Sequence, residues 1–162
     1  MIEAGGTWPL PDGYSSRAAE AGDAALLARF RLAMFRHIAP APFDEAAFEA
    51  HDAETLAREL ASGRTLAWFV EHGGRPVASA ALTLYAILPK PWNVDARYGY
   101  LSSLFTEPEH RRRGLARHLM GLAMEAARER GCAEVALHAA PDGRPLYESL
   151  GFAATNEMRR KA

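Results

Sequence analysis

A strand-like run, a long amphipathic segment and a second strand-like run follow one another in the second half of the chain. They occupy residues 98–106, 113–130 and 133–139. The middle segment carries an apolar stripe at helical spacing, made of Leu115, Leu119, Leu122 and Ala126. A strand that reaches its neighbour through a helix pairs with it in parallel. The order therefore predicts a parallel crossover.

Two further helices and a hairpin are predicted before this unit. Asp23 is expected to cap a helix whose inner face carries Leu26, Leu27, Phe30, Met34 and Phe35. A second helix is expected from residue 44 to 62, ended by Gly63. Residues 66–71 and 77–84 are predicted strands, joined by a turn that contains Gly73 and Gly74. The sheet should therefore be mixed and mostly antiparallel.

A short helix over residues 144–150 and a final strand over residues 152–159 are expected to complete the fold. Residues 88–97 form a polar loop with two prolines and Trp92, which either faces a substrate or packs its indole for stability. The chain of 162 residues suits one domain, predicted over residues 15–162. Residues 1–14, rich in Gly and Pro, are predicted to be a surface arm.

The composition is that of a soluble globular protein. It is 49% hydrophobic and 24% charged, with a formal net charge of -1. Apolar runs stop well short of the roughly 20 residues that cross a bilayer, and the first residues do not resemble a signal peptide. A cytoplasmic location without membrane partners is therefore expected. A homodimer is one possible assembly.

Metal and thiol chemistry are not expected. The single cysteine, Cys132, excludes an internal disulfide and a Cys-based metal cluster. It follows Gly131 at a predicted helix end, which favours a structural thiol over a nucleophile. The six histidines show no ligand spacing, so no metal is predicted.

A basic turn precedes the long helix. A helix N-terminus binds anions through its free N–H groups, and Gly114 leaves the backbone open there. Positive side chains are unfavourable at this end unless an anion joins them. The cations are Arg111, Arg112, Arg113 and Arg117. The alternative is a solvated patch offset by Glu107 and Glu109.

Other phosphate sites fit this turn less well. The turn contains neither GxxxxGK[ST] nor GxGxxG, which disfavours ATP hydrolysis and a Rossmann dinucleotide site. A nucleic-acid interface is the remaining alternative. It is disfavoured by the net charge and by the absence of a second basic stretch.

The turn and a later motif together resemble the GNAT superfamily of acetyl-CoA-dependent N-acetyltransferases. The family signature is Arg or Gln, two residues, Gly, one residue, then Gly or Ala, and residues 111–116 match it. A Leu-Tyr pair followed by a Gly-Phe pair matches residues 146–152, and the likeness extends over residues 17–158. The resemblance implies a three-layer α/β/α fold with a splayed parallel strand pair.

The resemblance also implies how acetyl-CoA would be held. The backbone of residues 112–116 would bind the pyrophosphate, and pantetheine would pair with the edge of the preceding strand. The implied cofactor residues are Leu104, Phe105, Thr106, Arg111, Arg112, Arg113, Gly114, Leu115, Ala116, Arg117 and Tyr147. A cofactor-contacting Asn of many members is missing here, and His138, Asp142 or water could replace it.

The expected reaction transfers an acetyl group to a primary amine of a small molecule or peptide, by direct attack in a ternary complex. By resemblance, the amide of Leu104 faces the thioester oxygen. Tyr147, whose ordinary pKa is near 10, is expected to protonate the leaving thiolate. Candidates for the base are Asp95, Tyr98, Tyr100, Ser102, Glu107, Glu109 and His138. The alternative is a non-catalytic acyl-CoA sensor or interaction module.

Overall fold

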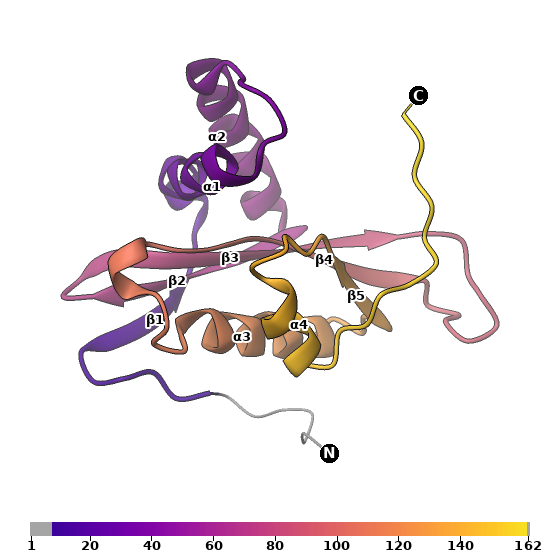
Figure 1. The fold of residues 1–162 in the computed structure, drawn as a ribbon. Coiled ribbons are helices and arrows are strands. Elements are labelled where there is room, and N and C mark those ends of the chain that lie inside the picture. The colour runs from indigo at the N-terminus through magenta and orange to yellow at the C-terminus, as the bar shows by residue number, and fades with distance from the viewer. Residues whose placement is uncertain (1–7, 162) are drawn as a thin grey trace.

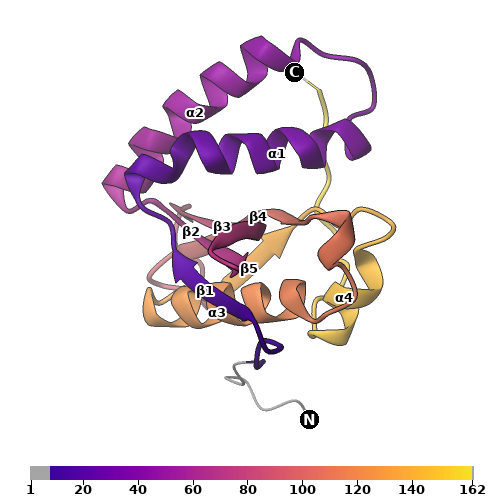
Figure 2. The ribbon, with the colours of Figure 1, turned by 90° about the vertical axis from the view of Figure 1, so that its left-hand side faces the viewer.

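A five-stranded sheet forms the middle layer of the protein, in a computed structural model that describes residues 8–161. Helices α1 and α2 cover one face, and α3 and α4 cover the other (Figures 1 and 2). The expected α+β fold with three layers is thereby confirmed. The elements are β1 (Tyr14–Ala18), η1 (Ala21–Asp23), α1 (Ala24–Ile38), α2 (Glu45–Ser62), β2 (Thr65–His72), β3 (Arg75–Ala86), β4 (Arg97–Thr106), η2 (Pro108–His110), α3 (Leu115–Glu129), β5 (Glu134–Leu137) and α4 (Arg144–Ser149).

The strands lie in the sheet in chain order, from β1 to β5. The first four pair antiparallel, whereas β4 and β5 pair in parallel on either side of the α3 crossover. Gly73 and Gly74 form the tight turn between β2 and β3, with φ of 58° and 75°. The mixed, mostly antiparallel sheet is therefore as expected, including its parallel pair.

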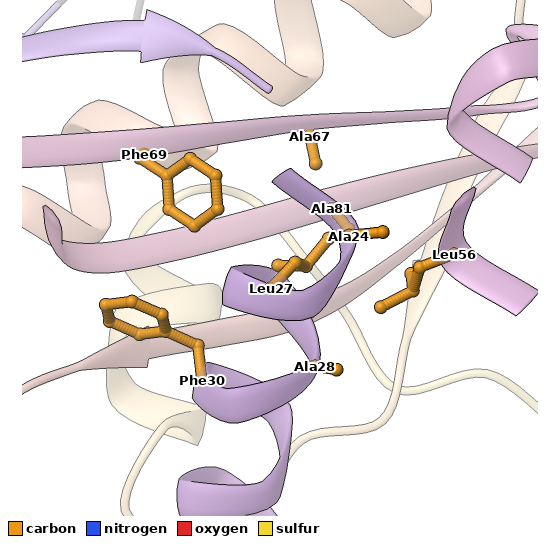
Figure 3. Packing of buried hydrophobic residues seen from close by; sticks show 8 residues of the cluster. All are labelled: Ala24, Leu27, Ala28, Phe30, Leu56, Ala67, Phe69 and Ala81. Atoms are coloured by element: carbon orange, nitrogen blue, oxygen red, sulfur yellow. The ribbon is translucent and has the colours of Figure 1, made fainter. Parts of the chain in front are cut away.

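Helix α1 is held on the sheet by an aromatic and aliphatic cluster (Figure 3). Leu27 and Phe69 are fully buried, and the rings of Phe30 and Phe69 lie 5.8 Å apart. Leu56 brings α2 into the same cluster. This packing fixes α1 and α2 over the middle of the sheet.

Helix α3 covers the other face with a slightly different stripe from the one predicted. Leu115 and Leu119 are buried as expected, but Leu122 is only half-buried. Met120 and Ala123 are buried instead, in a cluster that includes Leu82 and Leu101 of the sheet. The inner face of the helix is thus turned by one position toward Met120.

The predicted helix ends are only partly correct. Helix α2 begins and ends as expected, because the Asp44 side chain accepts the N–H of Ala47 and Gly63 has a φ of 70°. Asp23 precedes α1, yet its side chain makes no capping bond to that helix. It accepts the N–H of Glu20 instead, because the short turn η1 comes before α1.

The predicted last strand over residues 152–159 is wrong. Residues 152–161 follow α4 without regular structure. Phe152 packs against the core, but the side chains of residues 153–161 are exposed and give the segment no apolar face to bury. The predicted arm lies partly outside the described residues. Within it, the carbonyl of Trp8 accepts a hydrogen bond from His118 Nδ1 on α3.

Candidate functional site

Strand β4 has an unpaired edge at its end. Its parallel pairing with β5 runs from Tyr98 opposite Glu134 to Leu101 opposite Leu137, and stops there. Residues 102–106 continue β4 toward the basic turn, paired to β3 on one side only. This is the separation of two parallel strands that the family resemblance implies. It leaves backbone N–H and C=O groups free to bind an extended ligand.

The same segment contains a β-bulge. The register shifts so that Ser103 and Leu104 of β4 lie opposite Ala80 alone. Ser103 has a φ of 59°, and its carbonyl accepts a hydrogen bond of 3.0 Å from the Ser79 hydroxyl. A bulge bends the strand and redirects the groups beside it. The backbone of Leu104 therefore lies where β4 changes direction.

The basic turn connects the end of β4 to α3. Arg112 and Gly114 both have positive φ, 62° and 81°, and α3 begins immediately afterwards at Leu115. A Cβ added at Gly114 would meet no atom within 4 Å. Gly114 therefore leaves the start of α3 uncrowded, as an anion site at a helix N-terminus requires.

The arginines of this turn form no ion pair with the carboxylates that the structure describes. Within residues 8–161, no salt bridge up to 4.0 Å involves Arg111, Arg112, Arg113 or Arg117. Glu107, one of the two residues expected to offset them, pairs with Arg75 at 2.8 Å. The exposed cations at the helix start thus favour the anion site over a balanced surface patch.

Two of the four arginines are fixed by other groups. The Nε of Arg111 donates to the carbonyl of Thr106 at 3.0 Å. Arg117 donates to the Ser149 hydroxyl of α4 at 2.9 Å, and its guanidinium lies 5.6 Å from the centre of the Trp8 ring. The turn is therefore tied to β4 at one end and to α4 at the other.

Tyr147 lies on α4 and packs on the α3 side of the sheet. Its ring and the side chain of Leu104 contact the same core cluster. The ring also lies close to Gly143, where a Cβ would come within 3.0 Å of it. Burial raises the pKa of the hydroxyl, so Tyr147 stays protonated at neutral pH. It thus carries the proton that the predicted acid must supply.

The proposed base candidates are not gathered into one group. Tyr100 hydrogen-bonds to His138, which also contacts Arg159, and burial raises the pKa of the Tyr100 hydroxyl. The Tyr98 hydroxyl is buried without a partner among the described residues. The other candidates lie apart: Asp95 in an exposed loop, Ser102 on β4, and Glu107 and Glu109 around η2. The base remains a set of alternatives.

The loop between β3 and β4 does not pack its tryptophan. Trp92 is 73% exposed, which contradicts the alternative in which its indole packs for stability. The loop joins the start of β4, whereas the basic turn follows its end. The two segments therefore lie at opposite ends of that strand.

The sequence did not predict an ion pair between α1 and α2 that contacts the bulge at Ser103. The Nε of Arg31 on α1 donates to Asp52 Oδ2 on α2 at 2.7 Å, and its Nη1 donates to the Ser103 hydroxyl at 2.6 Å. The two side chains are only 18% and 12% exposed. Arg31 is not one of the apolar positions from which the inner face of its helix was predicted, and no periodic pattern marks Asp52.

An apolar pocket lies beside this ion pair. Its volume is about 330 Å³ and it is lined by Phe35, Ala39, Pro40, Ala41, Phe43, Asp44 and Phe48. The Arg31 guanidinium lies 5.5 Å from the centre of the Phe35 ring. Figure 2 shows the α1–α2 connection on the side of the molecule where α4 lies. The pocket is formed by α1, α2 and the segment that connects them.

Neither a reactive thiol nor a metal site is supported among the described residues. Burial raises the pKa of the Cys132 thiol, which disfavours the reactive thiolate. In the part of the chain that the structure describes, no three His, Cys, Asp or Glu side chains could together hold a metal ion. None of the described helices is long and apolar enough to span a bilayer.

The sequence matches a family model and a curated relative. Residues 32–152 match the model of the acetyltransferase (GNAT) family. A glucosamine 6-phosphate N-acetyltransferase from Trypanosoma brucei brucei is 33% identical over 87 residues. That match covers 54% of this chain and 57% of the relative, so it spans little more than half of either protein.

Two solved structures resemble the whole fold. A GCN5-related N-acetyltransferase from Ralstonia eutropha is 34% identical, with a TM-score of 0.85 over 93% of this chain and 99% of that one. A predicted acetyltransferase from Clostridium acetobutylicum, crystallised with acetyl-CoA, is 26% identical. It also has a TM-score of 0.85, over 92% of this chain and 96% of that one.

Proposed function

The chain belongs to the acetyltransferase (GNAT) family, and we propose that it transfers the acetyl group of acetyl-CoA to a primary amine of a small molecule or peptide. One observation carries the proposal. The unpaired edge of β4 leads directly into a helix start with exposed arginines that have no carboxylate partner among the described residues. An extended ligand with a pyrophosphate fits this combination.

The turn suits the pyrophosphate of acetyl-CoA. The N–H groups of the first turn of α3 follow the uncrowded Gly114, and Arg112 and Arg113 are exposed beside it. Together they offer hydrogen bonds and positive charge to a phosphate. The backbone of residues 104–106, on the free edge of β4, would pair with the amides of pantetheine. When bound, acetyl-CoA supplies the acetyl group as a thioester.

Two groups of this chain would act on the thioester. The N–H of Leu104, beside the β4 bulge, would stabilise the negative charge that develops on the thioester oxygen. Such a donor lowers a barrier by about 2.7–4 kcal/mol. Tyr147 would donate its hydroxyl proton to the leaving sulfur, and its raised pKa keeps that proton available at neutral pH.

The acceptor would enter from the α1–α2 side of the sheet. The apolar pocket beside Phe35 and Phe48 suits an uncharged group of the acceptor, next to the Arg31–Asp52 pair. The T. brucei relative is named for an amino-sugar phosphate, which makes amino sugars a second class to test. We therefore expect the acceptor to be either a primary amine with an apolar group that fits this pocket or an amino sugar.

A thiol-release assay tests the proposal. The protein is incubated with acetyl-CoA and a panel of aromatic amines, amino sugars, amino-sugar phosphates and short peptides, and free CoA is measured. We expect release that depends on the amine and saturates with it. Tight binding of acetyl-CoA with no release for any amine would instead indicate a non-catalytic acyl-CoA sensor.

A further inference from the structure

Ser103 holds an unusual backbone conformation at the point where β4 leaves β5. It is 2% exposed, and its φ of 59° lies in the left-handed region. Residues with a side chain rarely adopt this region, and they persist there when surrounding contacts hold them. The contacts that hold Ser103 in this conformation therefore also orient the backbone of Leu104, the next residue.

Ser103 is held from two different elements. On the sheet side, the Ser79 hydroxyl of β3 donates to its carbonyl at 3.0 Å. On the helix side, Nη1 of Arg31 donates to its hydroxyl at 2.6 Å. The Ser102 hydroxyl lies 3.3 Å from the same oxygen. Both the backbone and the side chain of Ser103 are thus fixed.

Arg31 is itself held by two contacts, one with Asp52 and one with the Phe35 ring. Its Nε donates to Asp52 Oδ2 at 2.7 Å, and its guanidinium lies over the Phe35 ring. The pair is shielded, since the two side chains are 18% and 12% exposed. A charged hydrogen bond is stronger in such a place than in water. The contacts form one continuous chain from α2 through α1 to β4.

We propose that Arg31, oriented by Asp52, is a positioning residue that holds the β4 bulge so that the Leu104 amide points at the thioester oxygen. The inference rests on the proposed function. Arg31 does not touch the reacting atoms, and it acts through the hydroxyl of Ser103. The competing explanation is that the ion pair only joins the two helices to the sheet.

Substitutions at position 103 separate these explanations. Ser103→Ala removes the hydroxyl and leaves a residue that disfavours a φ of 59°. Ser103→Gly also removes the hydroxyl, but glycine adopts this φ readily. If the bond serves to hold the conformation, glycine should preserve the site and alanine should not. Neither substitution removes an atom of the Arg31–Asp52 pair.

The readout is the thioester carbonyl itself. Acetyl-CoA labelled with ¹³C at that carbon is bound to each variant, and its chemical shift is compared with that of free acetyl-CoA. Affinities for acetyl-CoA and CoA are measured in parallel by calorimetry. We expect the wild type to move the signal downfield and Ser103→Ala to lose most of that change. The preference for acetyl-CoA over CoA should fall by up to roughly tenfold, as expected for one hydrogen bond.

Arg31 is tested in the same way. Arg31→Met should lose the downfield shift, and the double variant Arg31→Met with Ser103→Gly should regain it. The matched control is Arg29→Met, on the exposed side of the same helix, which should behave as the wild type. If Arg31→Met does not fold, the comparison of alanine and glycine at position 103 decides the question.

Two results would overturn the inference while leaving the proposed function intact. One is an unchanged carbonyl shift in Ser103→Ala and in folded Arg31→Met. The other is a loss in Ser103→Gly as large as that in Ser103→Ala. A wild-type protein that binds acetyl-CoA without any carbonyl shift would refute the inference and the proposed role of Leu104 together.

Discussion

Replacing Gly114 with alanine tests the proposed pyrophosphate site. Gly114 has a φ of 81°, and an added Cβ would meet no protein atom within 4 Å. The effect on folding therefore comes from the backbone conformation alone. It should lower the free energy of unfolding by about 1 kcal/mol. For a chain of 162 residues, this lowers Tm by about 2–4 °C.

Gly114→Ala should weaken the binding of CoA by more free energy than it takes from the stability of the fold. The new methyl group would stand where the pyrophosphate approaches the N–H groups at the start of α3. Loss of one charge-assisted hydrogen bond costs about 1.5–3 kcal/mol. Because 1.4 kcal/mol corresponds to a tenfold change in affinity, the Kd for CoA should rise by at least about tenfold.

Gly63→Ala is the matched control. Gly63 also has a positive φ, of 70°, and open space around it, but it ends α2 on the opposite face of the sheet from α3. Both variants should lose similar stability in thermal unfolding, and only Gly114→Ala should lose CoA affinity in calorimetry. Unchanged CoA binding by folded Gly114→Ala would refute the assignment of the turn.

Three further predictions concern the acid, a charged pair and the core. Tyr147→Phe should lower kcat by about 10²–10⁴-fold with little change in the affinity for acetyl-CoA, and a wild-type rate in the thiol assay would exclude Tyr147 as the acid. Arg17 holds the pKa of Asp23 below its ordinary 3.8, so the carboxylate stabilises the fold above that pH, and the contribution is lost on acidification through the lowered pKa. Asp23→Asn should accordingly flatten the acid side of the curve of unfolding free energy against pH, measured by urea denaturation, and an unchanged curve would contradict the pairing. Leu27→Ala, at a fully buried position, should lower the free energy of unfolding by about 3 kcal/mol, and a loss below 1 kcal/mol would contradict the packing of α1.

Much of the fold could be predicted because its signals are local. Paired glycines mark the β2–β3 turn, and Asp44 and Gly63 mark the ends of α2. The helix between two apolar runs is sufficient to predict the parallel crossover. Asp23 shows the limit of such signals, because a nearby arginine and an intervening turn engage its carboxylate instead of the helix.

The candidate site could be predicted where its residues follow one another in the sequence. The basic turn with Gly114 is a continuous motif, and the structure gives it the positive φ that glycine permits. The Arg31–Asp52–Ser103 contacts join residues 21 and 72 positions apart, so no periodicity reveals them. The positive φ of Ser103 is equally hidden, because serine does not mark left-handed backbone as glycine does.

Identification of the product tests the central proposal most directly. The protein is incubated with ¹³C-acetyl-CoA and the most active amine of the panel, and the label is followed by NMR and mass spectrometry. Acetyl transfer to an amine predicts that the label appears in an amide on the acceptor nitrogen, in equal amount to the CoA released. Label that remains on the protein, appears only as free acetate, or joins an oxygen of the acceptor would contradict direct transfer to an amine.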